Sequence, residues 1–269
     1  MIENSKENLA KLKDIKVFVL DMDGTIYLGE KVLKGAIEFI EDAKRSGIKI
    51  LYFTNNASKS KSVYLNKLHR LGFSAEFDDI VTSGDVTAEY LTTYHPGETV
   101  YLVGTPELEK VFREAGINLT DGSSADIVVS SFDTTLTYEK LVNASTLIRN
   151  GAVFYSTHPD FNCPTEDGYI PDSGAICALI TASTDKSPRY FGKPYRESAE
   201  MMARLCKIGF DEMAIVGDRL YTDIALGKNN GIMSILVLSG ETKEEDVTKD
   251  NRGDLVFDGI FSLRDNLFN

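Results

Sequence analysis

The stretch VFVLDMDGTIYLG, from Val17 to Gly29, places two carboxylates one residue apart directly after an apolar run. The run that ends at Leu20 is rich in β-branched and aromatic side chains, which is typical of a buried strand. Asp21 and Asp23 follow it, and like charges at this spacing repel and raise each other's pKa. A group that neutralises these two carboxylates is therefore expected close to them.

Apolar runs alternate with amphipathic stretches along the chain, which predicts an α/β fold with parallel sheets. Strands are expected at 15–20, 48–56, 99–104, 125–132, 152–157 and 232–240. Helices are expected at 35–47, 60–72, 107–115, 138–150 and 171–183, with a strand, loop and helix in 211–231 and a charged surface connection at 240–254. We predict one α/β core that is interrupted by a second α/β module.

Length and composition restrict the class of protein. The chain has 269 residues, of which 42% are hydrophobic and 26% charged, as in an ordinary globular protein of one large or two smaller domains. No apolar run approaches the roughly 20 residues that span a bilayer, and the N-terminus lacks the apolar stretch of a secretory signal. These features predict a cytoplasmic protein without a membrane partner.

Charge and metal-binding residue types narrow the partners. The net charge of −12 argues against nucleic-acid binding, which needs clustered Lys and Arg. A small anionic substrate is compatible with it, because a bound divalent cation can reverse the local field. Three cysteines without a CxxC pair and three histidines argue against a disulfide framework and a zinc site. Any metal should therefore be a hard cation that prefers oxygen ligands.

Polar residues follow several of the expected buried runs, and a lysine stands in a Gly-Pro turn. Ligands of open α/β sheets bind beyond the carboxyl ends of the strands, so these residues are the candidate site. Each alone is more often a turn former, a helix cap or a solvated side chain. Their occurrence as a set favours a shared function. The set is Asp21, Asp23, Thr54, Asn55, Asn56, Lys193, Asp218 and Asp223.

Four segments of the chain, DMDGT, FTNN, GKP and GDRLYTD in that order, resemble the four motifs of the haloacid dehalogenase superfamily of phosphohydrolases. The first and last segments are specific, whereas FTNN and GKP would be weak alone. The chain most resembles the NagD-like, nitrophenyl-phosphatase-like branch. This resemblance implies a Rossmann-like core in which helices flank a parallel sheet.

The spacing of the motifs supports that branch. Only a short strand–helix segment separates Asp23 from Thr54, whereas more than a hundred residues lie between Thr54 and Lys193. In family terms, this arrangement resembles a cap domain of the C2 type. The predicted division is a catalytic core at 1–81 and 187–269 with an inserted α/β cap at 82–186.

One cap segment, STHPDFNCP at 156–164, resembles the segment that contains the substrate-specificity loop of this branch. Asp160, Asn162 and Cys163 are its candidate substrate contacts. Turn hydrogen bonds explain Asp160 and Asn162 equally well, and Cys163 is also compatible with an ordinary packed thiol. We expect HPDFNCPTEDG to form a proline-bounded loop.

The resemblance implies Mg²⁺ as the cofactor, held by Asp21, Asp218 and the backbone carbonyl of Asp23. Such a cation would remove the repulsion between the paired acids. Asp21 is then the nucleophile that forms an aspartyl-phosphate, and Asp23 is the general acid and base.

The remaining motif residues receive supporting roles. Thr54 and Lys193 are expected to bind the phosphoryl oxygens. Asn55 and Asn56 are assigned to substrate binding or to bracing the loop. By resemblance, Asp223 supports the metal waters or Lys193.

The predicted function is hydrolysis of phosphate monoesters of small metabolites, with nitrophenyl phosphate as an artificial substrate. A phosphotransferase or phosphomutase would use the same intermediate, although sugar phosphomutases of the superfamily usually carry a cap between the first two motifs. A phospho-accepting signalling switch and an inactive binding protein are weaker alternatives. The sequence leaves the substrate and oligomeric state open. Related enzymes often pair through their caps, which makes a homodimer of that kind compatible with the resemblance.

Overall fold

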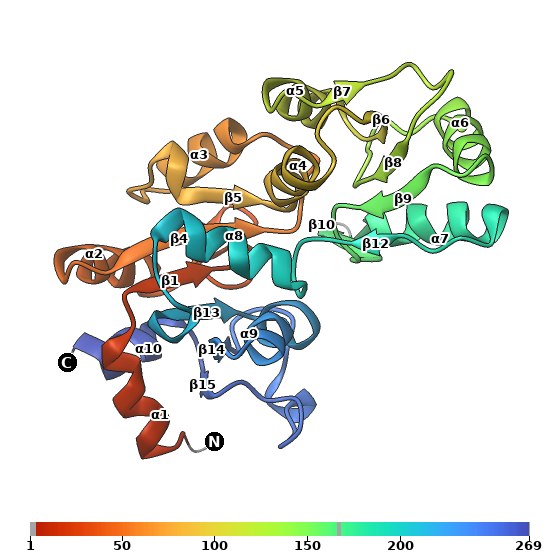
Figure 1. Ribbon diagram of the computed structural model, residues 1–269. Helices are drawn as coiled ribbons and strands as arrows, with labels where there is room; N and C mark the ends of the chain where they lie inside the picture. Colours follow the sequence, from red (N-terminus) through yellow and green to blue (C-terminus); the bar gives the residue numbers. More distant parts are fainter. Residues whose placement is uncertain (1–3, 166–167, 269) are drawn as a thin grey trace. The chain divides into compact units, whose positions relative to one another are not determined.

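The computed structural model describes residues 4–165 and 168–268, and these fall into two compact units. The first unit comprises the chain up to Phe53, Tyr64–Val81 and the chain from Lys193 onward. The second comprises Thr54–Val63 and Thr82–Gly192. Both contain parallel strands and helices (Figure 1), so the predicted α/β class is confirmed. The assignment of the two units as catalytic core and cap stays a prediction.

The first unit is built on a doubly wound sheet. Among the described residues its six strands follow the order β15 (Leu255–Phe257), β14 (Met233–Val237), β13 (Met213–Gly217), β1 (Val17–Leu20), β4 (Lys49–Thr54), β5 (Ile80–Thr82). Strand β1 pairs in parallel with β13 on one side and with β4 on the other. Numbered along the chain, this order is 3-2-1-4-5-6, so the winding reverses between β1 and β13.

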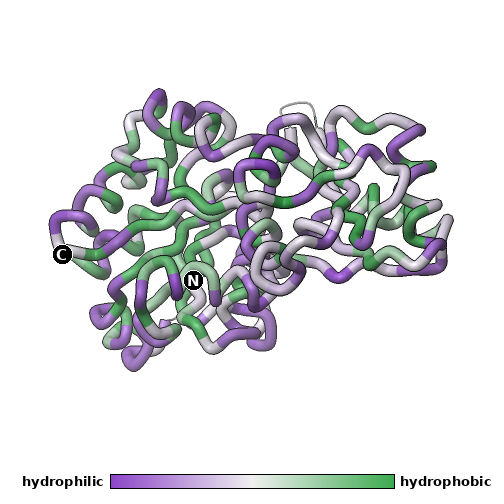
Figure 2. Tube along the Cα trace, turned by 45° about the horizontal axis from the view of Figure 1, so that its top comes forward, coloured by the Kyte–Doolittle hydropathy of each residue, from purple (hydrophilic) through white to green (hydrophobic). Residues whose placement is uncertain are grey.

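Apolar side chains on both faces of β1 explain its central position. Phe18 and Leu20 belong to a core cluster that also contains Phe39 of α2, whereas the alternating residues Val17 and Val19 are buried on the opposite face. Figure 2 shows apolar colour along these strands and hydrophilic colour on the outer turns of the helices. The helices of this unit are α1 (Lys6–Lys11), α2 (Ala36–Arg45), α3 (Lys61–Arg70), α8 (Arg196–Cys206), α9 (Ala225–Asn230) and α10 (Ile260–Phe268).

The second unit has its own sheet and helices. The five described strands of this sheet follow the order β12 (Arg189–Tyr190), β9 (Val153–Ser156), β8 (Ile127–Ser130), β6 (Thr99–Val103), β7 (Asn118–Leu119). Its helices are α4 (Ser83–Tyr94), α5 (Pro106–Glu114), α6 (Tyr138–Arg149) and α7 (Ser173–Thr184). Helices α6 and α7 contribute Leu147, Ile148, Ile176 and Ile180 to its core.

Two short antiparallel strand pairs complete the described strands. Strands β2 (Tyr27–Leu28) and β3 (Lys31–Val32) follow the DMDGT segment, and β10 (Asn162–Thr165) pairs with β11 (Gly168–Pro171). The prediction of a proline-bounded loop over HPDFNCPTEDG is therefore wrong for Asn162–Thr165 and Gly168, which lie in these strands, whereas residues 158–161 do form a loop. Backbone pairing, such as that of Cys163 with Ile170, overrides the turn-forming composition. Glu166 and Asp167 of this segment lie outside the described residues.

Several elements fall outside the predicted set. The helices among them are α1, α4, α8 and α10, and the strands are β5 and β15 together with the shorter or hairpin strands β2, β3, β7, β10, β11 and β12. Strands β5 and β15 are each three residues long, which is too short for a clear period-2 pattern. Helix α8 follows the GKP turn directly and buries only Ser198, Ala199 and Met202, so it has no long apolar stripe.

The helices and the surface give two further observations. Within residues 4–165 and 168–268, every helix is too short or too polar to traverse a bilayer.

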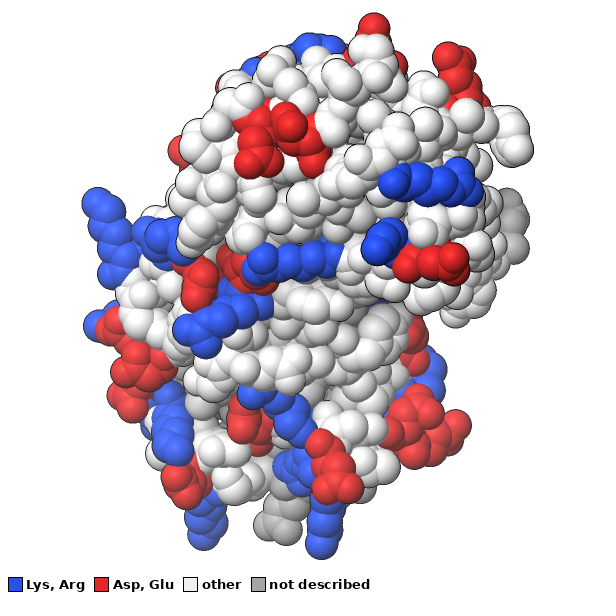
Figure 3. All heavy atoms as spheres, turned by 45° about the vertical axis from the view of Figure 1, so that its right-hand side comes forward, with Lys and Arg blue, Asp and Glu red and all other residues white. Residues whose placement is uncertain are grey.

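On the face drawn in Figure 3, acidic and basic side chains are interspersed.

The core of the first unit yields a stability prediction. Phe39 is fully buried, and its ring lies 5.2 Å from that of Phe18 in an edge-on arrangement. We expect Phe39→Ala to lower the free energy of unfolding by about 3–5 kcal/mol, because it removes apolar contacts and leaves a cavity. Denaturant unfolding of parent and variant measures the change. Phe77→Ala is the control, since Phe77 is 49% exposed and should change the free energy by less than about 1 kcal/mol.

Candidate active site

The candidate site lies where the sheet of the first unit reverses its winding. Asp21 directly follows β1 and Asp218 directly follows β13, and the Asp21 N–H donates to the Val216 carbonyl at 2.8 Å. Because β1 and β13 are paired in parallel, their carboxyl ends emerge side by side. This is the crevice in which open α/β sheets bind their ligands.

Three carboxylates meet at this point. Asp21, Asp218 and Asp223 each place one oxygen within 4.8 Å of the others, and this set could hold a metal ion. Asp218 and Asp223 are buried, whereas Asp21 is half-buried. Asp223 belongs to a π-helical turn, Leu220–Ile224, a local distortion that is frequent at functional sites. Its side chain packs so closely against Gly217 that a Cβ there would lie 2.1 Å from the Asp223 carboxyl carbon.

Lys193 supplies a buried positive charge to this cluster. Its ammonium group contacts Asp21 Oδ1, lies 2.7 Å from Asp223 Oδ1 and donates to the Phe53 carbonyl at 3.3 Å. Burial alone would lower the pKa of Lys193, but the carboxylates of Asp21 and Asp223 outweigh this effect and raise it. The lysine is therefore charged at neutral pH and partly balances the carboxylates.

Of the three carboxylates, Asp218 has the negative charge that neighbouring groups offset least. Its Oδ2 accepts a hydrogen bond from the Glu241 N–H at 2.6 Å, whereas its buried Oδ1 has no hydrogen-bond partner among the described residues. Burial, followed by the charges of Asp21 and Asp223, raises the pKa of Asp218. A buried carboxylate oxygen without a hydrogen bond, close to two further carboxylates, fits the donor set of a hard divalent cation.

Asp23 stands apart from this trio, whose third carboxylate comes from Asp223. The Asp23 side chain is exposed, and its backbone forms a bridge with Tyr27 at the start of β2. Partial desolvation raises the pKa of Asp23, the charge of Lys67 lowers it, and the charge of Asp21 raises it further. The carboxyl group is thus open to solvent and has a raised pKa. Metal binding by its backbone carbonyl stays a prediction.

Thr54 and Asn56, at the end of β4 and just beyond it, take part in a local turn. Thr54 is the last residue of β4, and its hydroxyl accepts from the Asn56 N–H at 3.1 Å. Asn56 Oδ1 in turn accepts from the N–H and the hydroxyl of Ser58 at 3.0 and 2.6 Å. These hydrogen bonds stabilise a turn, which is a common role of Thr and Asn side chains. A substrate-binding role for Thr54 and Asn56 stays a prediction.

Asn55 connects the residues after β4 with the proposed specificity segment of the second unit. Its Nδ2 donates to Asp160 Oδ2 at 3.2 Å, and its carbonyl accepts from the Ser83 hydroxyl at 2.5 Å. Asp160 is buried, whereas Asn162 is exposed and Cys163 is half-buried in β10. The structure thus brings Asp160 to Asn55, but the role of these residues toward a substrate stays a prediction.

Several polar residues in or beside the motifs were absent from the predicted site. Arg219 follows Asp218 directly, and its Nε lies 3.0 Å from Glu241 Oε2. The position of Arg219 inside GDRLYTD could have identified it, whereas Glu241 lies in the charged connection predicted to be only surface. His158 is also buried, with Nε2 2.8 Å from Asp172 Oδ1, and it forms a second potential metal-binding group with Asp160 and Asp172.

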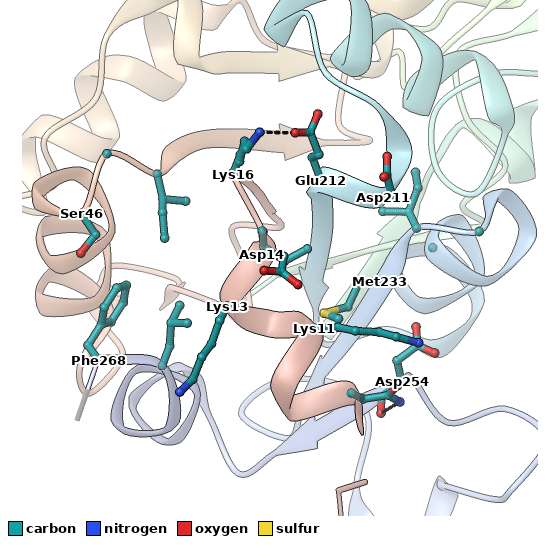
Figure 4. A pocket seen from close by; sticks show the side chains of 18 of the residues that line it. Lys11, Lys13, Asp14, Lys16, Ser46, Asp211, Glu212, Met233, Asp254 and Phe268 are labelled. Atoms are coloured by element: carbon teal, nitrogen blue, oxygen red, sulfur yellow. Dashed lines mark hydrogen bonds and ion pairs between the residues drawn. The ribbon is translucent and has the colours of Figure 1, made fainter. Parts of the chain in front are cut away.

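A large hollow lies at the other end of the first unit's strands (Figure 4). It has a volume of 1510 Å³ and is bordered by residues that precede β1, β13 and β14, such as Lys16, Glu212 and Ile232. Lys16 and Glu212, next to each other in its lining, form an ion pair. Its lining among the described residues includes no member of the predicted site. Chemistry and topology, rather than the size of a hollow, therefore locate the candidate site.

The raised pKa of Asp218 predicts that this residue makes the metal-free protein less stable as the pH rises. A carboxyl group whose pKa is higher in the folded state stabilises the fold at low pH, and this contribution is lost as the pH rises. In EDTA, we expect Asp218→Asn to be more stable than the parent at about pH 8 by at least about 1 kcal/mol, roughly 2–4 °C in Tm. The difference should narrow toward about pH 5. Thermal unfolding across this range measures it, and a parent more stable than the variant at pH 8 would contradict it.

Comparison with known proteins agrees with this geometry. The model of the haloacid dehalogenase-like hydrolase family matches residues 18–118, and a HAD-hydrolase-like model matches residues 190–263. An acid sugar phosphatase of Staphylococcus aureus is 39% identical over 242 residues, which cover 89% of this chain and 93% of that protein.

Solved structures give the same relationship. The crystal structure of 4-nitrophenylphosphatase from Thermotoga maritima is 42% identical with a TM-score of 0.92, covering 96% of this chain and 99% of that one. NagD from Escherichia coli K-12 is 28% identical with a TM-score of 0.86, covering 92% and 97%. The chain therefore belongs to the haloacid dehalogenase-like hydrolases, as a phosphatase of their NagD-like branch.

Proposed function

We propose that this chain is a Mg²⁺-dependent phosphatase that hydrolyses phosphate monoesters of small metabolites through an aspartyl-phosphate on Asp21. The observation that carries the proposal is the meeting of Asp21, Asp218 and Asp223 with buried Lys193 at the switch point of the sheet. Carboxylates gathered with one buried cation suit the binding of a metal together with an anionic phosphoryl group.

The proposed Mg²⁺ ligands are Asp21, Asp218 and the backbone carbonyl of Asp23. The buried Oδ1 of Asp218, which has no hydrogen-bond partner among the described residues, supports this assignment. When bound, Mg²⁺ would offset the charge of these carboxylates and of the phosphoryl oxygens.

In the first step, a carboxylate oxygen of Asp21 attacks phosphorus while the bond between phosphorus and the ester oxygen breaks. The contact with the Lys193 ammonium supports this role, because it fixes the orientation of the Asp21 carboxyl group. Asp23 gives its proton to the leaving oxygen. Its raised pKa and its access to solvent suit a group that carries a proton to a departing alcohol.

In the second step, Asp23 takes a proton from water, whose oxygen attacks phosphorus and breaks its bond to Asp21. Lys193, together with the Thr54 hydroxyl and nearby backbone N–H groups, is proposed to bind the phosphoryl oxygens. Asp223 holds Lys193 through the ion pair of 2.7 Å. Asp223 is thus proposed to position the lysine.

A sugar phosphate is the substrate class that we propose, with nucleotides and other small phosphate esters as competitors. The name of the S. aureus relative, acid sugar phosphatase, supports a sugar ester, and that of the T. maritima relative supports cleavage of nitrophenyl phosphate. We propose that residues 82–186 act as a cap, with Asp160, Asn162 and Cys163 toward the substrate and Asn55 bracing Asp160. Pairing of two copies through this cap is part of the same proposal.

A phosphotransferase would form the same intermediate and pass the phosphoryl group to an alcohol instead of water. Product analysis in the presence of an alcohol acceptor separates the two activities. Multiple turnovers of nitrophenyl phosphate would exclude a signalling switch that only accepts and holds phosphate.

The test of the nucleophile is Asp21→Asn, assayed with Mg²⁺ and 4-nitrophenyl phosphate. We expect turnover to fall below a few per cent of the parent, because uncatalysed hydrolysis of phosphate monoesters is among the slowest reactions known. Asp78→Asn, at an exposed position, is the matched control and should retain parental turnover. Mass spectrometry excludes deamidation of the introduced amide back to a carboxylate, and substantial turnover of the intact variant would refute the covalent mechanism.

A further inference from the structure

The loop after β14, Ser239–Thr242, is built around Asp218. The Glu241 N–H donates to Asp218 Oδ2 at 2.6 Å, and the Thr242 N–H donates to the Asp218 carbonyl at 3.2 Å. At the start of the loop, the Ser239 hydroxyl donates to the Gly24 carbonyl at 2.8 Å. The loop therefore connects the motif that contains Asp218 with the DMDGT segment that contains Asp21 and Asp23.

Two glycines allow this close approach. A Cβ on Gly240 would lie 2.0 Å from Asp218 Oδ2, and a Cβ on Gly24 would lie 2.4 Å from the same oxygen. Asp218 Oδ2 thus sits between two backbone segments, which leave no space for another side chain. Its position depends on the position of the loop.

The side chain of Glu241 is itself held by the residue next to Asp218. Glu241 Oε2 lies 3.0 Å from Arg219 Nε and accepts from the Tyr221 hydroxyl at 3.4 Å. The Arg219 N–H donates to Asp223 Oδ2 at 3.2 Å, so the same residue also contacts the third carboxylate of the cluster. Arg219 and Glu241 therefore close a ring of contacts: the Glu241 side chain to Arg219, and the Glu241 N–H to Asp218.

We propose that the Arg219–Glu241 ion pair is a positioning clamp that fixes the Glu241 N–H on Asp218 Oδ2 and so presents Asp218 Oδ1 to the metal. The inference rests on the proposed function, because it assigns the clamp to the affinity of the Mg²⁺ site. Both residues act through Asp218, and neither needs to touch the substrate.

The clamp would decide which of the two carboxylate oxygens of Asp218 is available to the metal. A buried carboxylate can rotate, and a hydrogen bond to one oxygen selects the other oxygen as the ligand. The ion pair is partly exposed, with side-chain exposures of 18% for Arg219 and 39% for Glu241. Because Arg219 is mostly buried, loss of its partner would also lower the stability of the fold, so the affinity for Mg²⁺ is the measurement that tests the clamp.

The test compares Glu241→Ala with Glu241→Gln. Both variants lose the negative charge that pairs with Arg219, but glutamine keeps a polar side chain of the same length as glutamate. We expect both variants to weaken the Kd for Mg²⁺, by about 10–100-fold for Glu241→Ala and by less for Glu241→Gln. Isothermal titration of the metal-free protein with MgCl₂ measures the Kd directly. Activity assays should show a raised Mg²⁺ requirement for Glu241→Ala.

Two controls complete the experiment. Glu200→Ala removes the exposed Arg196–Glu200 pair of α8 and should leave the Kd unchanged. Asp218→Asn removes the proposed ligand itself and should abolish Mg²⁺ binding.

The outcomes separate the two proposals. Parental Mg²⁺ affinity in Glu241→Ala would overturn the clamp. Parental Mg²⁺ affinity in Asp218→Asn would overturn the proposed metal site, and with it the basis of the clamp.

Discussion

The arrangement of the candidate site depends on one buried ion-pair network, in which Lys193 joins carboxylates from two different segments of the chain. Asp21 follows β1, and Asp223 lies in the turn after β13. Lys193 lies in the GKP turn, which stands between them in the sequence. Burying these charges is unfavourable unless they are paired. The network therefore requires β1, β13 and the GKP turn to fold together.

Several local features near the site serve to place the charged side chains of this network. Gly217 leaves room for the Asp223 side chain, and the π-helical turn at 220–224 directs Asp223 toward Lys193. Asp218 remains only partly compensated. Its buried Oδ1 has no hydrogen-bond partner among the described residues, and a bound cation would offset its charge.

The sequence was sufficient to predict the α/β class and the convergence of Asp21, Asp218 and Lys193. Polar residues that follow apolar runs are expected at the carboxyl ends of parallel strands, which meet at one edge of the sheet. The arrangement of Arg219 with Glu241 could not be predicted, since it depends on where the loop after β14 turns. The β10–β11 hairpin was missed for a related reason. Its pairing is set by backbone hydrogen bonds between Asn162–Thr165 and Gly168–Pro171, and proline and asparagine in the segment indicate a loop.

The grouping of Thr54–Val63 with the second unit has a consequence for protein engineering. This short stretch leaves β4 and then contacts residues far along the chain, with Asn55 bonded to Asp160 and the Ser58 carbonyl accepting from the Thr105 hydroxyl at 2.9 Å. A chimera that exchanged only residues 82–192 for those of a relative would combine one protein's connecting stretch with another's binding partners. Transplanting this module intact would require carrying residues 54–63 along with it.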